Sequence, residues 1–147
     1  MKRVAILGLG LMGGSLGLAI KARGLPWQVA GFTRTPARGR KALKRGAVDF
    51  LYDDPVEAVR GADMVVLCGP VLALADQARA CRAGLKTGAV VTDVGSTKTF
   101  VAKDVSVALR GSGASFVGSH PLCGSEQQGI ESAHADLYDG ALVMVTP

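Results

Sequence analysis

Six residues near the N-terminus have the types and spacing of a phosphate-binding loop. Gly8, Gly10 and Gly13 fit the pattern G-x-G-x-x-G, directly after a short apolar run and before a stretch with helical spacing. The first glycine permits a tight turn, the second lets a pyrophosphate approach the backbone, and the third lets helix and strand pack closely. A glycine-rich turn without a ligand is the alternative, and the strand–loop–helix context favours dinucleotide binding at the helix N-terminus. The predicted cofactor-binding residues of this loop are Gly8, Leu9, Gly10, Leu11, Met12 and Gly13.

The end of the next apolar run, residues 29–32, indicates which nicotinamide cofactor is bound. NAD-specific folds place an acid here, which accepts a hydrogen bond from the ribose 2′-hydroxyl. This sequence has Thr33 and Arg34 instead, and no acid occurs from Thr33 to Val48. Because an arginine pairs with a 2′-phosphate through charge-assisted hydrogen bonds, we expect NADP to be favoured, with NAD possible. A basic, solvated helix that accepts either cofactor is the alternative.

Two further segments carry polar groups where strands are expected to end. Residues 91–98 read V-T-D-V-G-S-T-K, and residues 118–126 read G-S-H-P-L-C-G-S-E. Open α/β sheets bind their ligands at the carboxyl ends of their strands, so both segments are candidate sites. Taken alone, His120 could equally be a core histidine bonded to a backbone carbonyl, and Ser96 and Ser125 could cap following helices.

The order of strands and helices would bring these segments together. We expect strands at 4–7, 29–32, 64–68, 89–92, 115–118 and 142–145, and helices at 11–23, 35–46, from 54, 71–82, 97–109 and 126–135. Most of these strands are continuous apolar runs, which is typical of strands buried on both faces of a parallel sheet. The predicted fold class is therefore α/β, with a Rossmann-type, doubly wound and mostly parallel sheet. Residues 1–147 are predicted to form one NAD(P)-binding domain.

Composition and charge disfavour several other classes of protein. The chain has 147 residues, 48% of them hydrophobic, which suffices for one core. Three widely spaced cysteines and two histidines match no metal-ligand pattern, and reduced thiols suit a cytoplasmic protein. The longest uncharged stretch, residues 4–20, contains five glycines, so we expect neither a membrane span nor a signal peptide. The basic cluster at 34–45 lacks the aromatic partners and reading helix of nucleic-acid binders, so no nucleic-acid partner is expected.

The quoted motifs closely resemble those of the prephenate and arogenate dehydrogenase family. The matching elements are G-L-G-L-M-G-G-S at 8–15, T-D-V-G-S-T-K at 92–98, G-S-H-P-x-x-G-S-E at 118–126 and T-P at 146–147. The paired D-V-G-S and S-H-P segments are more specific than the phosphate loop. The resemblance implies NAD(P)-dependent oxidative decarboxylation of prephenate to 4-hydroxyphenylpyruvate, or of arogenate to tyrosine, in tyrosine biosynthesis.

The resemblance also implies roles for individual residues. His120 stands where the family's histidine binds the substrate's ring hydroxyl and helps remove its proton, and Ser96 would hydrogen-bond that hydroxyl or the histidine. The residue type suits the role, because hydride loss from a carbinol carbon requires a base and imidazole titrates near neutral pH. Ser125 and Glu126 would lie at the mouth of the substrate site.

The sequence departs from the family pattern beside the expected cofactor. Gly69 and Pro70 would run close to the nicotinamide ribose. Gly69 replaces a residue that is commonly threonine in the family, and this puts one cofactor contact in doubt. Cys123 stands where alanine is usual.

Family members carry a second, helical domain after the T-P segment, which provides the dimer interface and the cations that hold the substrate's carboxylates. We therefore expect the chain to be truncated and to bind cofactor while turning over little or no substrate, with homodimerisation depending on the missing domain. One alternative is another NADP-dependent dehydrogenase or reductase of the β-hydroxyacid type, which the segment at 118–126 argues against. The other is an inactive nucleotide-binding fragment. Intact His120 and Ser96 argue against a decayed site, and they leave an inert fragment open.

Overall fold

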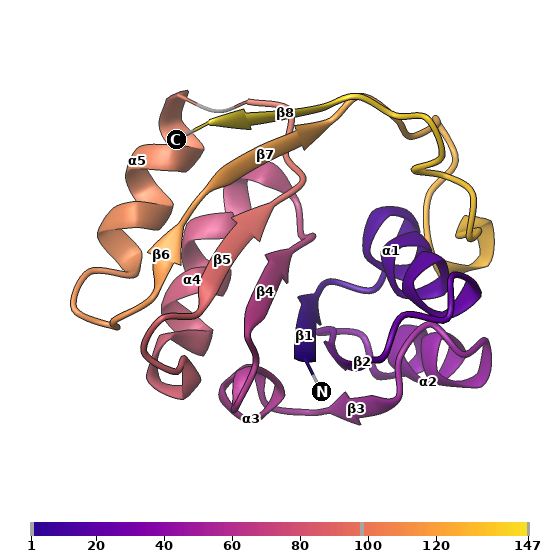
Figure 1. The fold of residues 1–147 in the computed structure, drawn as a ribbon, viewed down its shortest axis with the longest axis horizontal. Helices are drawn as coiled ribbons and strands as arrows, with labels where there is room; N and C mark the ends of the chain where they lie inside the picture. The colour runs from indigo at the N-terminus through magenta and orange to yellow at the C-terminus, as the bar shows by residue number, and fades with distance from the viewer. Residues whose placement is uncertain (1, 98, 147) are drawn as a thin grey trace.

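A parallel sheet flanked by helices organises the chain (Figure 1), in a computed structural model that describes residues 2–97 and 99–146. The strands are β1 (Lys2–Leu7), β2 (Trp27–Phe32), β3 (Phe50–Tyr52), β4 (Met64–Leu67), β5 (Val90–Asp93), β6 (Ser115–Phe116), β7 (Gly118–Pro121) and β8 (Val143–Thr146). The α-helices are α1 (Leu11–Ala22), α2 (Pro36–Lys44), α3 (Pro55–Val59), α4 (Leu74–Cys81) and α5 (Thr99–Ala108), and short 3₁₀ turns cover Val71–Ala73, Arg82–Gly84 and Ile130–Ser132.

The strand order of the main sheet is β3-β2-β1-β4-β5-β6, and all neighbouring strands in it are parallel. Strands are added on one side of β1 as far as β3, and then on the other side from β4 onward. In such sheets a ligand crevice opens at the carboxyl ends of the strands, where the order reverses. The predicted α/β, doubly wound, Rossmann-type fold is confirmed.

Hydrophobic cores on both faces of the sheet explain the continuous apolar strands. In β1, Ala5 and Leu7 belong to a core formed with α3, α4 and α5, whereas Val4 and Ile6 belong to a core formed with α1 and α2. Successive residues of a strand point to opposite faces, so burial on both sides requires apolar residues at every position. Within the part of the chain that the structure describes, no helix is long and apolar enough to cross a membrane.

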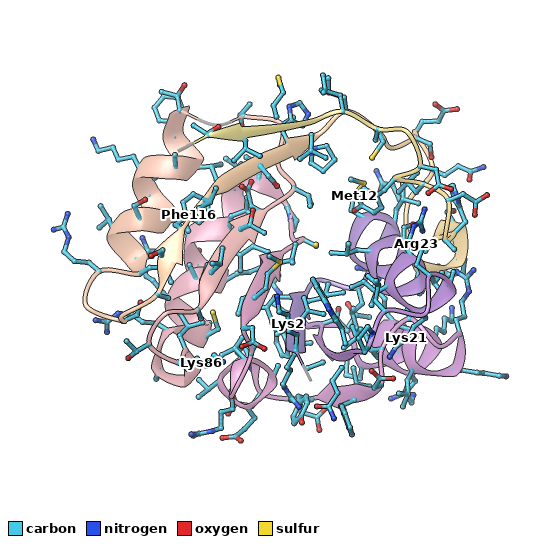
Figure 2. All side chains as sticks on the ribbon, in the orientation of Figure 1. Lys2, Met12, Lys21, Arg23, Lys86 and Phe116 are labelled. Atoms are coloured by element: carbon cyan, nitrogen blue, oxygen red, sulfur yellow. The ribbon has the colours of Figure 1, made fainter. Side chains whose placement is uncertain are left out.

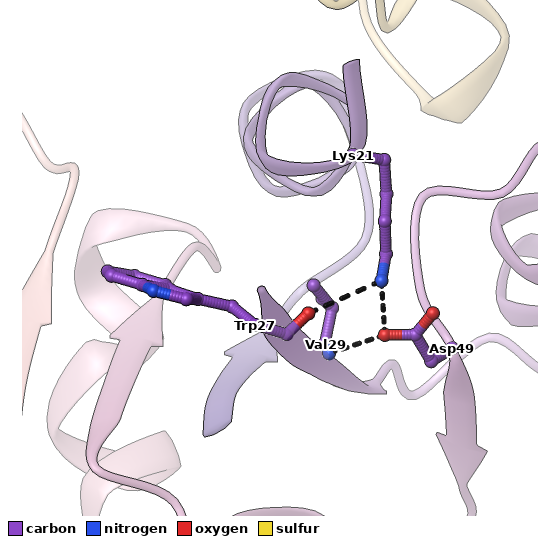
Figure 3. Close-up of polar contacts among 4 residues, drawn as sticks. All are labelled: Lys21, Trp27, Val29 and Asp49. Atoms are coloured by element: carbon purple, nitrogen blue, oxygen red, sulfur yellow. Dashed lines mark hydrogen bonds and ion pairs between the residues drawn. The ribbon is translucent and has the colours of Figure 1, made fainter. Parts of the chain in front are cut away.

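Polar contacts fix the C-terminal end of α1 to β2 (Figure 3). The Lys21 ammonium donates to the Asp49 carboxylate and to the Trp27 carbonyl oxygen, the latter at 3.4 Å. The same Asp49 oxygen accepts a hydrogen bond from the Val29 N–H at 2.8 Å. These contacts hold α1 in one orientation, with its N-terminus directed at the carboxyl edge of the sheet.

The helix predicted at 126–135 is wrong. This segment forms only one 3₁₀ turn, Ile130–Ser132, preceded by Gly129 with a φ of 86°. Ile130 is 1% exposed and packs so closely on α1 that a Cβ on Gly14 would lie 2.4 Å from its Cδ1 atom. Packing of Ile130 against a glycine far away in the sequence therefore overrides the local helix signal. Ser125 accordingly caps no helix, and its Oγ accepts a hydrogen bond from the Gln127 N–H at 3.1 Å.

The last strands also differ from the prediction. The strand expected at 115–118 divides into β6, which joins the main sheet, and β7, which leaves it. The strand expected at 142–145 does not close the main sheet, because β8 pairs antiparallel with β7 in a separate two-stranded ribbon. Strand β3 was missed, since its three residues are too few to show a pattern.

Candidate functional site

The carboxyl ends of the strands surround a cavity of about 470 Å³. Figure 2 shows Met12 near this edge of the sheet, while Lys2 and Lys86 lie at the opposite edge. The lining of this cavity includes Gly10, Leu11, Met12, Cys68, Gly69, Pro70, Gly95, Ser96, His120, Cys123 and Ser125. Segments from four separate parts of the chain thus meet at the crevice that the strand order creates.

The glycines of the loop after β1 have the steric roles expected of a phosphate loop. Gly8 has a φ of 105°, and a Cβ there would lie 2.8 Å from the Cys68 carbonyl carbon. A Cβ on Gly13 would lie 1.9 Å from the Gly8 carbonyl oxygen, so only glycine allows α1 to approach the loop. A Cβ on Gly10, by contrast, would meet no protein atom within 4 Å. The space beside Gly10 is therefore open to a ligand. Leu9, which is fully buried, contributes its side chain to the core instead.

A second cavity, of about 230 Å³, continues from the first toward β2 and α2. Gly10, Gly69 and Pro70 line both cavities. The lining of the second cavity also includes Thr33, Arg34 and Arg38. Together the two cavities form an elongated site that crosses the N-terminus of α1. Among the described residues that line it, the basic side chains are Arg34 and Arg38, both in the second cavity.

Gln77 is a residue of this site that the sequence did not single out. Its side chain accepts a hydrogen bond from the Gly69 N–H at 3.3 Å and donates to the Leu7 carbonyl oxygen at 3.4 Å, so it links the ends of β4 and β1. A Cβ on Gly69 would lie 2.5 Å from the Gln77 amide nitrogen. Gln77 therefore occupies the space that a side chain at position 69 would need. The sequence signal for Gln77 was Gly69, which stands at a position where threonine is common in the resembled family.

His120 and Ser96 lie on the first cavity, as does Ser125. His120 comes from β7, and Ser96 follows β5, so the two strand-end segments do converge. Among the described residues no hydrogen bond joins the two side chains directly. Glu126 is exposed and does not line the cavity, so the structure does not bring it together with the others. Lys98 and Pro147, which end two of the quoted motifs, lie outside the described residues.

Burial raises the pKa of two cysteine thiols that line the first cavity and of a tyrosine hydroxyl bonded to Met12 of the same lining. Burial, together with the nearby charge of Asp93, raises the pKa of the Cys68 thiol to about 12. Burial also raises the pKa of the Cys123 thiol. It raises the pKa of the Tyr138 hydroxyl too, and this hydroxyl donates to the Met12 carbonyl oxygen at 2.8 Å. A thiol with a raised pKa is a poor nucleophile, so His120 is the better candidate for proton transfer in this cavity.

Residues 122–142, here called the strap, connect β7 to β8 and form one wall of the first cavity. In Figure 1 the strap runs from the ribbon across α1 and back. Arg45 of the basic cluster donates to the carbonyl oxygens of Ile130 and Ala133, the latter at 2.7 Å. Further contacts join Lys41 to Glu131, Arg23 to Asp139 and the His134 N–H to Ser15 Oγ. Lys41 and Arg45 of the basic cluster thus have a structural use that the sequence alone did not reveal.

We expect Arg45→Ala to release the strap locally. The change removes two charge-assisted hydrogen bonds to backbone carbonyls, each worth about 1.5–3 kcal/mol. Cleavage of the strap by a glutamate-specific protease should become about tenfold faster, because local opening is governed by such contacts. Arg40→Ala is the matched control, since Arg40 is an exposed residue of the same helix. Equal cleavage rates in the two variants would contradict the anchoring role.

The site has the features that a nicotinamide dinucleotide requires. The space beside Gly10 is open, and the first turn of α1 contains no acidic residue. Anionic ligands are favoured at a helix N-terminus because its N–H groups lack helical partners. The cavity with Arg34 and the cavity with His120 lie on either side of this point.

Comparisons with known proteins are consistent with this geometry. The family model "prephenate dehydrogenase, nucleotide-binding domain" matches residues 16–147. A prephenate dehydrogenase from Lactococcus lactis is 32% identical over 99% of this chain and 41% of its own length. The crystal structure of Synechocystis arogenate dehydrogenase matches 99% of this chain and 50% of its own, with a TM-score of 0.89 and 32% identity.

A second solved structure adds information on ligands. Prephenate dehydrogenase from Aquifex aeolicus, in complex with hydroxyphenyl propionate and NAD+, matches all of this chain and 51% of its own, with a TM-score of 0.89 and 31% identity. The chain thus spans about half, or less, of the length of these relatives.

Proposed function

This chain belongs to the prephenate dehydrogenase family, and we propose that it supplies the nucleotide-binding part of an enzyme that oxidatively decarboxylates prephenate or arogenate. The observation that carries the proposal is the shared cavity. The loop at the N-terminus of α1, Ser96 after β5 and His120 on β7 all line it. A cofactor held at the helix N-terminus would therefore lie beside an acid–base group.

The reaction removes a hydride and carbon dioxide from the substrate. A bound nicotinamide would supply the acceptor for the hydride of the substrate ring. His120 accepts the proton of the ring hydroxyl, and Ser96, on the same cavity, hydrogen-bonds that hydroxyl and keeps it oriented. Carbon dioxide leaves as the ring becomes aromatic, and the phenolate oxygen so formed takes a proton back. Ser125 contributes a further hydroxyl at the mouth of the cavity.

The substrate's carboxylates need cations that this cavity does not supply. Among the described residues that line it, none is a lysine or an arginine. Fixed positive charges that hold a reactant in place are worth several kcal/mol of the barrier. We therefore assign the carboxylate-binding groups to the part of the longer relatives that this chain does not match.

Steady-state assays test the proposed function. The natural polypeptide that contains this chain should form reduced cofactor with prephenate or arogenate, and the comparison of the two substrates identifies the preferred one. Residues 1–147 alone should bind cofactor and turn over little or no substrate. Lack of activity with both substrates in the natural polypeptide would refute the proposal.

We propose further that NADP is preferred over NAD. Thr33, Arg34 and Arg38 line the second cavity, and no acid stands at the end of β2. Arg34→Ala should weaken NADP binding by about tenfold or more, the worth of one hydrogen bond to a charged group, while NAD affinity stays nearly unchanged. Calorimetric titration of the purified chain measures both affinities.

Arg40→Ala is again the matched control, because Arg40 belongs to the same basic cluster as Arg34 and does not line the second cavity. Tighter binding of NAD than of NADP by the unaltered chain would overturn the preference, and the dinucleotide site itself would still stand.

A further inference from the structure

Asp93 is a fully buried carboxylate at the end of β5. Burying a charge is costly unless hydrogen bonds compensate for its lost hydration. One carboxylate oxygen accepts from the Gly95 N–H at 2.9 Å, and the other accepts from the Ser119 N–H at 3.1 Å. The side chain therefore bonds to both segments that carry the candidate site residues.

The contact between Asp93 and Ser119 replaces a step of the sheet ladder. Ser115 donates to the Ala89 carbonyl oxygen and Val117 to the Val91 carbonyl oxygen, both at 2.9 Å. The next bond in this series would join the Ser119 N–H to the Asp93 carbonyl oxygen. Instead the Ser119 N–H bonds to the Asp93 carboxylate, and the Ser119 hydroxyl donates to the Asp93 carbonyl oxygen at 2.5 Å.

This change of hydrogen-bond partners occurs at the point where β7 leaves the main sheet. Strand β6 ends at Phe116, and β7 departs to pair with β8. The side chains of Asp93 and Ser119 lie between the two backbones, and their hydrogen bonds link β5 to β7 where the strands diverge. Thr92 Oγ1 supports the arrangement by donating to Ser119 Oγ at 3.3 Å.

We propose that Asp93 and Ser119 are positioning residues for the reaction, because they set the placement of His120 relative to Ser96. His120 directly follows Ser119, and Ser96 follows Gly95, so the hydrogen bonds from the Ser119 N–H and the Gly95 N–H each act one residue away from a candidate catalytic side chain. This inference rests on the proposed function. It assigns to the pair no direct contact with substrate or cofactor.

The test uses steady-state kinetics of the natural polypeptide that contains this chain. Ser119→Ala removes the hydroxyl and should lower kcat by about tenfold, with the KM for cofactor unchanged within about twofold, because misplaced catalytic groups affect turnover and not uniform binding. Ser119→Thr keeps the hydroxyl and should retain most of the activity. Asp93→Asn places an amide N–H₂ against an N–H donor and should lower kcat by about tenfold or more.

Asp63→Asn is the matched control. Asp63 also accepts a hydrogen bond from a backbone N–H, that of Arg3, at 2.8 Å, but it directly precedes β4, at the opposite edge of the sheet from the cavity. This variant should keep the wild-type kcat. Because Asp93 and Ser119 act as one unit, the double variant Asp93→Asn/Ser119→Ala should lose less than the product of the single effects.

A second readout is independent of catalysis. In amide NMR spectra of residues 1–147, Ser119→Ala should shift the His120 and Gly95 resonances together, and Ser119→Thr should restore them. An unchanged kcat in Ser119→Ala, or equal losses in Ser119→Ala and Ser119→Thr, would overturn the positioning role. If the natural polypeptide is inactive with both substrates, the proposed function fails, and the spectra still decide whether Ser119 couples the two segments.

Discussion

Replacing His120 with glutamine should lower kcat by about 10²–10⁴-fold, the usual contribution of a positioned general base. Glutamine can still hydrogen-bond the substrate's ring hydroxyl, but it cannot accept the proton that must leave as the hydride departs. His120 lies on the cavity that also includes the loop at the start of α1. Cofactor affinity should nevertheless stay within about twofold, because the phosphate contacts are made elsewhere. Turnover is measured in the natural polypeptide and affinity by titration of the chain.

His134→Gln provides the control for this experiment. His134 is the other histidine of the chain, is exposed on the strap and does not line the cavity. It should keep wild-type turnover. Activity within tenfold of wild type in His120→Gln would mean that water or another group accepts the proton, and would remove His120 from the catalytic role. Loss of cofactor binding in that variant would instead indicate a role in ligand binding.

The elements that position the site were predictable where the local sequence pattern and the tertiary packing favour the same structure. Gly8 and Gly13 meet local steric requirements of a strand–turn–helix unit, so their spacing predicted the turn, and the dinucleotide beside it stays a prediction. The apolar runs predicted a sheet buried on both faces, and two cores confirm this. Motif resemblance then drew attention to Ser96 and His120, which line one cavity although they come from separate strands.

Apart from β3, which is too short to show a pattern, the misses share a physical cause, namely contacts between residues distant in sequence. Ile130 packs against Gly14, and its segment does not form the helix that the local sequence predicts. Arg45 donates hydrogen bonds to carbonyl oxygens of the strap. No local pattern encodes either contact. The departure of β7 depends on a carboxylate and a hydroxyl, Asp93 and Ser119, which replace a ladder bond. Both residues lie within the motifs at 91–98 and 118–126, but the local sequence does not indicate that they bond to each other.

Gly10→Ala should weaken cofactor binding while leaving the fold intact. A Cβ at this position meets no protein atom within 4 Å, and φ is −89°, but the ψ of −148° lies outside the main β region, so alanine adds some backbone strain without a clash. Stability should therefore fall by about 1 kcal/mol, the low end of the cost of a sparsely populated backbone conformation. The methyl group projects into the space where a pyrophosphate would contact the backbone, so affinity for either cofactor should fall by about tenfold or more.

Gly13→Ala is the matched comparison, because it adds the same methyl group in the same loop. Here the Cβ would lie 1.9 Å from the Gly8 carbonyl oxygen and 2.9 Å from Ile6 Cγ2, so loop and helix must separate. Overpacking of this kind costs about 1–3 kcal/mol or more, and thermal unfolding should shift accordingly. The two variants thus separate the ligand-facing glycine from the packing glycine. Unchanged cofactor affinity in a stable Gly10→Ala chain would show that the phosphates do not approach the backbone at this point, and the dinucleotide site would have to lie elsewhere.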